Sequence, residues 1–240
     1  MLINKMKKLL YIFTLVITLV SVKETFSQDS YMAGANANYY IPLGTLSDRY
    51  KPAMGESFYF GKDVSENWTW VGKLEYCKFD DMNMDKLVIT RRLTTNGPQY
   101  KIPLSKINIS LEEVGLTANA SYHMLSTDIM KADIELGFGI YRWKHTRADY
   151  KDSVYVDTTG KGDLALEEYL NVPGRTEEDW SGGLNVGFSV DVNVYKWASV
   201  YASASYKMII GELWPALSLD LENVSGMQMI ELRAGIRARF

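Results

Sequence analysis

The sequence is poor in residues that stabilise or activate many exported proteins. Its 240 residues include one cysteine, Cys77, and two histidines. A single cysteine excludes an internal disulfide framework, and its position far from the N-terminus excludes a lipid-modified terminal cysteine. Two histidines are few for the usual zinc-ligand sets, and we expect neither a metal nor another cofactor. The net charge of −3 lacks the basic excess of a general nucleic-acid binder, so no nucleic-acid partner is expected.

Long apolar runs are also missing, apart from one near the N-terminus. Leu9–Val20 is uncharged and largely apolar, and three lysines precede it. A membrane-spanning helix needs about 20 residues, so this run is short for an anchor and is typical of a secretory signal peptide. We predict a signal peptide over 1–27, cleaved after Ser27, with an uncleaved anchor as the alternative. The remaining 28–240 carry a net charge of −6 and fit one domain.

What the chain has in abundance is alternation of apolar and polar residues. From Ile230 to Phe240 every second residue is apolar, with charged residues or glycine between. Strict alternation predicts strands, because a helix needs apolar residues three and four positions apart. Five stretches show this pattern: 114–124, 132–140, 184–194, 200–208 and 230–240. Less regular strands are expected near 31–40, 56–64 and 67–79, which brings the total to eight.

The expected connections alternate between short and long. The short ones are 65–67, 125–130 and 195–197. The long ones are 41–55, 80–108, 147–179 and 211–226, and they carry most of the prolines. Strands joined in this way form an up-and-down meander with all long loops at one end.

The two faces of these strands differ in a way that decides the environment. One face carries bulky Leu, Ile, Val and Phe, and the other carries small polar and charged residues. A soluble barrel buries its apolar face, whereas a transmembrane barrel turns it toward lipid. The signal peptide and the aromatics near strand ends favour the transmembrane arrangement. Those aromatics are Tyr31, Tyr39, Trp68, Trp70, Tyr122, Trp143, Tyr195 and Trp197. The expected fold is an all-β, transmembrane, up-and-down antiparallel β-barrel of eight strands.

The segment AGIRARF with its terminal Phe240, and more loosely SLEEVGLTANASYHM, carry a family resemblance. Over 28–240 the pattern resembles the eight-stranded outer-membrane β-barrels that include OmpA, OmpX and OmpW-like proteins, and especially the Bacteroidetes-type outer membrane β-barrel domain. The resemblance implies a place in the outer membrane of a Gram-negative cell, surrounded by outer-membrane lipid and lipopolysaccharide. It also implies that Phe240 on the last strand is the signal read by the outer-membrane assembly machinery.

The polar face would line the barrel interior. Its charged members are Lys73, Glu75, Glu113, Asp133, Glu135, Asp191, Lys207, Glu231, Arg233, Arg237 and Arg239. Eight strands leave an interior that side chains fill, and charges in such a space must pair because desolvation is costly. We expect the arginines of the last strand to lie near acids on neighbouring strands, and Glu231 and its neighbours to lie beside Asn36 and Asn38. A closed polar interior follows, with a narrow water-filled pore as the alternative.

Few residues suggest catalysis, and no catalytic site is assigned. His123 is expected to be a hydrogen-bonded interior residue. His145 lies near the outer rim with Asp149, Asp152 and Ser153, which could form a base, an orienting acid and a nucleophile. The His-x-Ser spacing of lipid A deacylases is absent, so the sequence favours a non-enzymatic protein over a rim enzyme acting on lipid.

The long loops carry opposite charge. Residues 81–108 sum to +3 and residues 147–179 to −5. Loops on a rigid scaffold often form binding sites, and a structural or interaction role is therefore predicted. The partner would be an envelope or extracellular molecule, or lipopolysaccharide. The basic candidates for contact are Lys86, Arg91, Arg92 and Lys101. The same segment predicts a hairpin around Asn96-Gly97, which would make ten strands if it joined the barrel.

Overall fold

The computed structural model describes residues 31–92, 99–104, 107–157, 164–210 and 226–240. The predicted signal peptide 1–27 and most of the predicted loop 211–226 lie outside these ranges. Within the described residues, no helix is long and apolar enough to cross a membrane.

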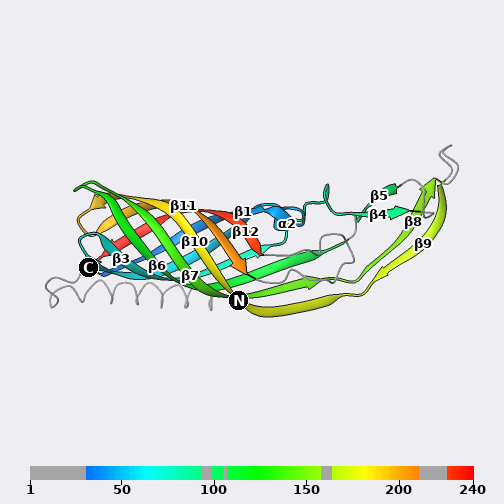
Figure 1. Ribbon diagram of the computed structural model, residues 1–240, viewed down its shortest axis with the longest axis horizontal. Coiled ribbons are helices and arrows are strands. Elements are labelled where there is room, and N and C mark those ends of the chain that lie inside the picture. The colour runs from blue at the N-terminus through cyan, green and yellow to red at the C-terminus, as the bar shows by residue number, and fades with distance from the viewer. Residues whose placement is uncertain (1–30, 93–98, 105–106, 158–163, 211–225) are drawn as a thin grey trace, which may run out of the picture.

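Eight of the described strands form a closed antiparallel barrel (Figure 1). They are β1 (Tyr31–Leu43), β2 (Ala53–Ser65), β3 (Trp68–Phe79), β6 (Ile109–Ser126), β7 (Met130–Arg147), β10 (Arg175–Tyr195), β11 (Ala198–Ile210) and β12 (Met227–Arg239). Each strand pairs with its predecessor in the barrel, and β12 closes onto β1. At the seam, the backbone N–H groups of Tyr31 and Phe240 each donate to the other's carbonyl oxygen at 2.9 Å. The predicted up-and-down, eight-stranded barrel is confirmed.

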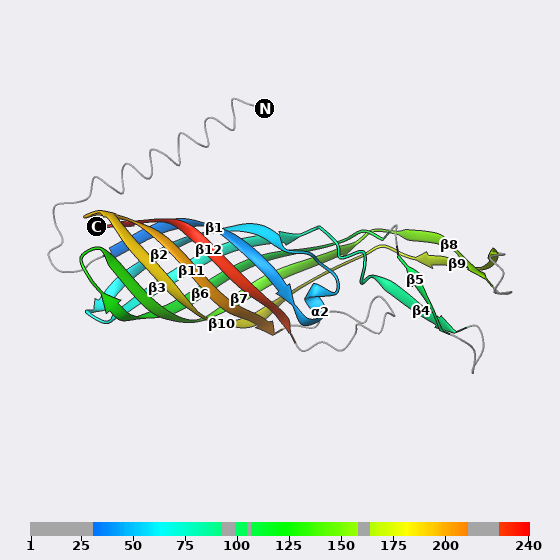
Figure 2. The ribbon, with the colours of Figure 1, turned by 90° about the horizontal axis from the view of Figure 1, so that it is seen from above.

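The two ends of the barrel differ as expected. The β2–β3, β6–β7 and β10–β11 turns are tight and share one end with the C-terminus, which we call the turn end. The other, the loop end, carries the short helix α2 (Gly44–Ser47) and two projecting hairpins (Figures 1 and 2). The predicted loop 41–55 is shorter than expected, because β1 continues to Leu43 and β2 already begins at Ala53.

The projecting hairpins are separate two-stranded sheets. One pairs β4 (Val88–Arg92) with β5 (Gln99–Pro103), and the other pairs β8 (Tyr150–Asp157) with β9 (Leu164–Val172). Neither joins the barrel, so the ten-strand alternative is wrong. The first is the predicted basic hairpin, although Asn96 and Gly97 themselves lie outside the described residues. The second lies within the long loop predicted over 147–179. Its two strands were not predicted, because apolar and polar residues alternate only weakly along them.

The outer wall of the barrel is apolar. Phe58, Phe138 and Phe188 are each about 60% exposed, and the residues opposite Phe58 on the two adjacent strands, Ala35 and Leu74, are also apolar. Along β7 the outward apolar residues run from Ala132 to Ile140. Nine residues rising about 3.4 Å each on a strand tilted by about 40° give a belt roughly 23 Å tall, close to that of outer-membrane barrels.

Aromatic residues mark the turn end of this belt. Trp68 packs on Tyr122 with ring centroids 5.1 Å apart, and Tyr195 stacks on Trp197 at 6.1 Å. Trp143 was expected to join such a girdle, but that prediction is wrong. It is only 4% exposed and points inward, where its N–H donates to Ser181 Oγ at 2.9 Å. Its odd residue number places it on the same face of β7 as the predicted interior charges of that strand.

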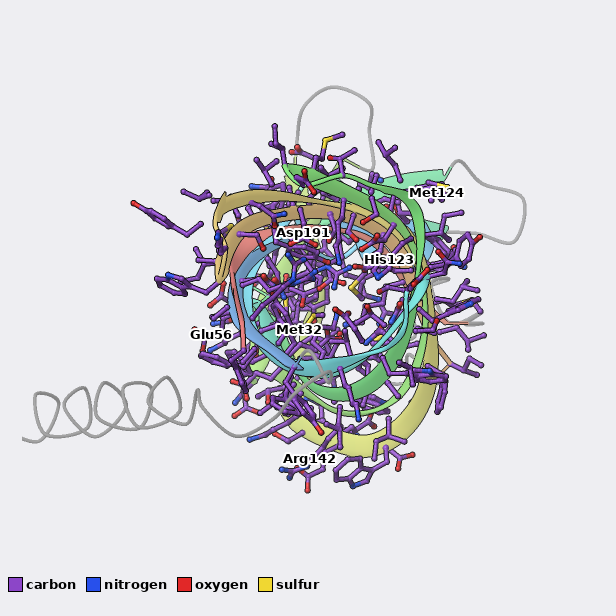
Figure 3. All side chains as sticks on the ribbon, turned by 90° about the vertical axis from the view of Figure 1, so that its left-hand side faces the viewer. Met32, Glu56, His123, Met124, Arg142 and Asp191 are labelled. Carbon is purple, nitrogen blue, oxygen red and sulfur yellow. The ribbon has the colours of Figure 1, made fainter. Side chains whose placement is uncertain are left out.

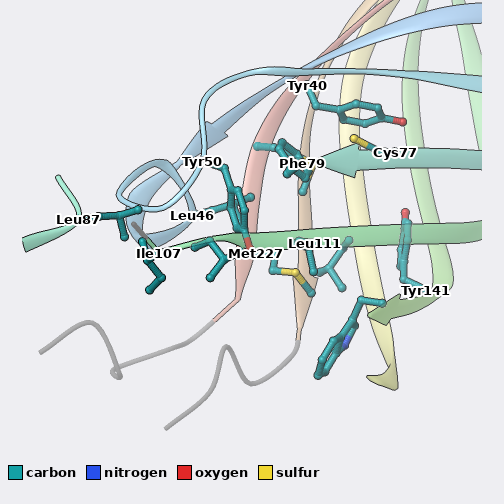
Figure 4. Close-up of a cluster of buried hydrophobic side chains, with 14 of the residues drawn as sticks. Tyr40, Leu46, Tyr50, Cys77, Phe79, Leu87, Ile107, Leu111, Tyr141 and Met227 are labelled. Carbon is teal, nitrogen blue, oxygen red and sulfur yellow. The ribbon is translucent and has the colours of Figure 1, made fainter. Parts of the chain in front are cut away.

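Seen along its axis, the barrel is filled with side chains (Figure 3). His123 and Asp191 point inward, whereas Met124 and Arg142 point outward. The inner residues are polar toward the turn end, but toward the loop end they form an apolar cluster (Figure 4). A polar interior throughout was expected, and this part of the prediction is wrong.

Candidate functional site: the closed interior and its cap

The predicted interior charges all lie on the inner wall. Ten of the eleven are buried, and Arg239 is partly buried at the turn end. Alternation along each strand accounts for this placement, since residues two positions apart share a face. The charges form one histidine group and three ion-pair groups, two of which are linked because Arg233 Nε lies 3.9 Å from Glu231 Oε2.

The first group is centred on Lys207 of β11. Its Nζ donates to Glu75 Oε1 at 2.6 Å and to Glu113 Oε1. Lys73 Nζ lies 2.6 Å from Glu75 Oε2 and 3.4 Å from Glu231 Oε2. The Lys207 ammonium also lies 4.5 Å from the centroid of the Tyr141 ring. Two lysines and three glutamates therefore form one connected cluster.

Two further groups surround the arginines of β12. Arg233 pairs with Glu135, which also accepts the hydroxyl hydrogen of Tyr201 at 2.7 Å. Arg237 pairs with Asp191, and Arg239 Nη2 lies 3.9 Å from the same carboxylate.

Apart from contacts within one strand, such as Lys73 with Glu75 on β3, these pairs cross the interior rather than joining adjacent strands. β12 lies between β1 and β11, yet Arg233 reaches Glu135 on β7 and Arg237 reaches Asp191 on β10. Lys207 on β11 likewise reaches β3 and β6. The prediction that the arginines would meet acids on neighbouring strands is wrong, because a barrel of eight strands is narrow enough for long side chains to span. At the seam, Asn38 pairs with Arg233 and Asn36 with Gly235, so neighbours of Glu231 lie beside both asparagines as expected. Glu231 itself pairs with Tyr40.

The histidine group lies near the turn end. His123 Nδ1 is 2.6 Å from Asp133 Oδ1, and its Nε2 is 3.0 Å from Thr69 Oγ1. All three side chains are buried. The expected hydrogen-bonded interior role of His123 matches this geometry.

An apolar cap closes the loop end of the interior. Leu46 of α2 and Tyr50 pack over Phe79, Leu111 and Met227, all of them buried (Figure 4). Tyr50 and Phe79 have ring centroids 5.8 Å apart, and burial raises the pKa of the Tyr50 hydroxyl. The cap thus adds a dry layer above the charged groups.

Hydrogen bonds between two loops hold the cap in place. Asn83 Nδ2 donates to the Ser47 carbonyl oxygen at 2.8 Å, and the Asn83 N–H donates to the Arg49 carbonyl oxygen at 2.9 Å. Lys86 Nζ pairs with Asp48 Oδ1 at 3.0 Å. Lys86 was a candidate for partner contact, and here it joins the two loops. Of the other candidates, β4 carries Arg91 and Arg92 and β5 carries Lys101, but their side chains lie outside the described part.

The cap was not predicted from the sequence, because it interrupts the alternation of apolar and polar residues along the strands. Several of its strand residues are apolar at inward positions where the pattern predicts polar ones, as at Phe79, Leu111, Tyr141 and Trp143. Apolar residues at inward positions recur at the loop ends of β1, β3, β6, β7, β11 and β12, and these exceptions are the signal that could have revealed the cap.

The structure places the residues of the predicted rim set around His145 on different elements. His145 is 3% exposed, and burial, together with Arg49 and Arg147, lowers its pKa to about 3. Asp149 Oδ1 instead accepts the Gly174 N–H at 2.6 Å. Ser153 lies on β8 of the projecting hairpin, as does Asp152, whose side chain lies outside the described part. Among the described residues, no cluster of metal-ligating side chains is present.

Comparison with known proteins identifies the fold. No family model matches the sequence, and no curated protein matches it. Among solved structures, a major outer membrane protein of Thermus thermophilus is 11% identical with a TM-score of 0.56, covering 89% of this chain and 100% of its own. Neisserial surface protein A is 16% identical with a TM-score of 0.46 over 89% of this chain and all of its own. OprG of Pseudomonas aeruginosa is 11% identical with a TM-score of 0.44 over 88% and 95%. The chain therefore has the fold of the eight-stranded outer-membrane β-barrels.

Proposed function

We propose that the protein is an outer-membrane anchor whose rigid, closed barrel holds the β4–β5 and β8–β9 hairpins outside the cell to bind an envelope or extracellular partner. The observation that carries this proposal is the closure of the interior. Three cross-barrel ion-pair groups and an apolar cap fill it, and one interior space is only about 10 Å³, about the room for a single water.

The hairpins support the binding part of the proposal. They project past the apolar belt, as the two side views show (Figures 1 and 2). Tyr155 and Tyr169 of the β8–β9 hairpin are 55% and 76% exposed. Exposed aromatic residues are common anchors in binding surfaces, and here they lie beyond the region that lipid would cover.

The test is extraction of the protein from native outer membranes in mild detergent, followed by identification of what co-purifies in stoichiometric amount. Replacement of 150–172 by a short Gly-Ser linker is expected to abolish co-purification while the barrel still reaches the membrane. The matched control replaces the turn 127–129, at the opposite end, and retains the partner. Equal recovery of the partner from both variants would refute a role for the hairpin.

Two further measurements separate the rival functions. In planar bilayers the purified barrel is expected to give no discrete conductance steps, because the cap and the ion pairs occupy the described interior. Stable steps would favour the narrow pore. Lipid A from cells with and without the protein is expected to be the same, and a difference in acylation would favour a lipid-modifying enzyme.

A further inference from the structure

A row of alternating charges ends the apolar belt on one side of the barrel. Lys78 of β3 pairs in register with Glu112 of β6, which pairs with Lys144 of β7, which pairs with Glu178 of β10. All four have even numbers. On β3, β6 and β10 the residue two positions nearer the turn end also has an even number, and it is apolar and faces outward. The row therefore lies on the outer wall at the depth where a bilayer passes from acyl chains to headgroups.

A recess opens directly above this row. Its volume is about 440 Å³, and Lys78, Asp80, Asn108, Ser110, Thr146 and Ala148 line it. The recess lies where β3 and β7 end and β6 begins, and the Ala148 N–H donates to the Asn108 carbonyl oxygen at 2.9 Å to close one side. Its lining combines an ammonium, a carboxylate, an amide and two hydroxyls, in contrast to the apolar wall below.

We infer that this recess binds the phosphorylated sugar headgroup of an outer-leaflet glycolipid, that is, lipopolysaccharide, whose acyl chains lie along the belt beneath. Continuity with the lipid-facing wall places a lipid headgroup here in preference to a soluble ligand. Hydroxyl, amide and carboxylate groups suit sugar hydroxyls, and lysine binds phosphate as a point charge. The inference rests on the proposed location of the barrel in the outer membrane.

The Lys78 ammonium is suited to the phosphate. Its Nζ lies 3.6 Å from Glu112 Oε1 and 4.0 Å from Asp80 Oδ2, both longer than a hydrogen bond, and its side chain is 41% exposed. The two carboxylates orient the ammonium without occupying its donors. A phosphate oxygen at the mouth of the recess therefore completes the site.

The experiment measures lipid binding to the purified, detergent-solubilised mature barrel by native mass spectrometry. The probes are bis-phosphorylated lipid A, its dephosphorylated form and phosphatidylglycerol. Ser110→Trp fills the recess, and Lys78→Gln removes the charge with little change in volume. The matched controls are Ser126→Trp, at the other end of β6, and Lys196→Gln, in the β10–β11 turn. Heat-modifiable migration on gels confirms that each variant is folded.

Wild type is expected to bind bis-phosphorylated lipid A about tenfold more tightly than the dephosphorylated form, as loss of one charge-assisted contact predicts. Ser110→Trp weakens binding of both forms, Lys78→Gln abolishes the preference between them, and the controls match wild type. Unchanged binding by Ser110→Trp, or equal binding of phosphatidylglycerol, would overturn the inference. Cell fractionation tests the proposed location separately, because the binding assay uses protein already removed from the membrane.

Discussion

At the scale of single residues, the buried charges are stable only as complete groups. Lys207 offsets two carboxylates, Glu75 and Glu113, that lie side by side on the adjacent strands β3 and β6. Removing water from an ion costs several kcal/mol, and a close partner of opposite charge recovers this energy. A partly dismantled group is therefore less stable than either an intact group or a neutral one.

Lys207→Met is expected to lower the free energy of unfolding by about 3–5 kcal/mol, because it leaves the Glu113 carboxylate without its cation and the adjacent Glu75 with Lys73 alone. Urea unfolding of the barrel in lipid vesicles, followed by tryptophan fluorescence, gives the measurement. Adding Glu75→Gln and Glu113→Gln to the same chain is expected to restore most of the loss. A triple variant no more stable than the single one would show that packing, and not charge, dominates at this position.

His145 is expected to make the loop end sensitive to mild acid. Its pKa is about 3 in the folded protein, below its ordinary value near 6.5, because burial and two nearby arginines disfavour the charged ring. The folded state therefore binds fewer protons, and stability decreases as the pH falls from about 6.5 toward 3. Melting temperatures between pH 7.5 and pH 5 should fall more steeply for wild type than for His145→Gln. Parallel curves would assign the acid sensitivity to other groups.

At the scale of the strands, glycines shape the interior as much as the charged residues do. The Tyr141 ring is fully buried on β7, and it lies over Gly115 of β6 and Gly183 of β10. A methyl group at Gly115 would come within 2.5 Å of Tyr141 Cε1. Because glycine has no side chain, these two positions on the neighbouring strands leave the space beside Lys207 that the ring occupies.

Gly115→Ala is accordingly expected to destabilise the barrel by about 1–3 kcal/mol through overpacking. Gly72→Ala is the matched control, since a methyl group there would meet only a carbonyl oxygen at 3.8 Å, and it should change stability by less than about 0.5 kcal/mol. Thermal unfolding of both variants in one detergent compares their stabilities. The effect should shrink in a Tyr141→Leu background, and an equal effect there would rule out the ring as its cause.

At the scale of the whole molecule, Phe240 lies at the seam where the barrel closes. Its backbone exchanges two hydrogen bonds with Tyr31, and its ring stacks on that of Tyr31 at 6.5 Å. Deleting Phe240 is expected to leave unassembled protein in the periplasm, whereas Phe240→Tyr assembles normally. Refolding of the purified deletion variant in detergent separates the two roles. If it refolds with wild-type stability, the residue acts in assembly; if its stability falls with its assembly, the residue acts in closure.

The sequence by itself determined the strands, their alternation of faces and the up-and-down order, because a strand places successive side chains on opposite faces whatever lies across from it. It also determined which charges line the interior. Which charges meet was decided only by the tertiary structure, since pairing across the barrel depends on register and diameter, and no single strand encodes either. The cap was decided in the same way, because two loops far apart in sequence close it together over the ends of the strands.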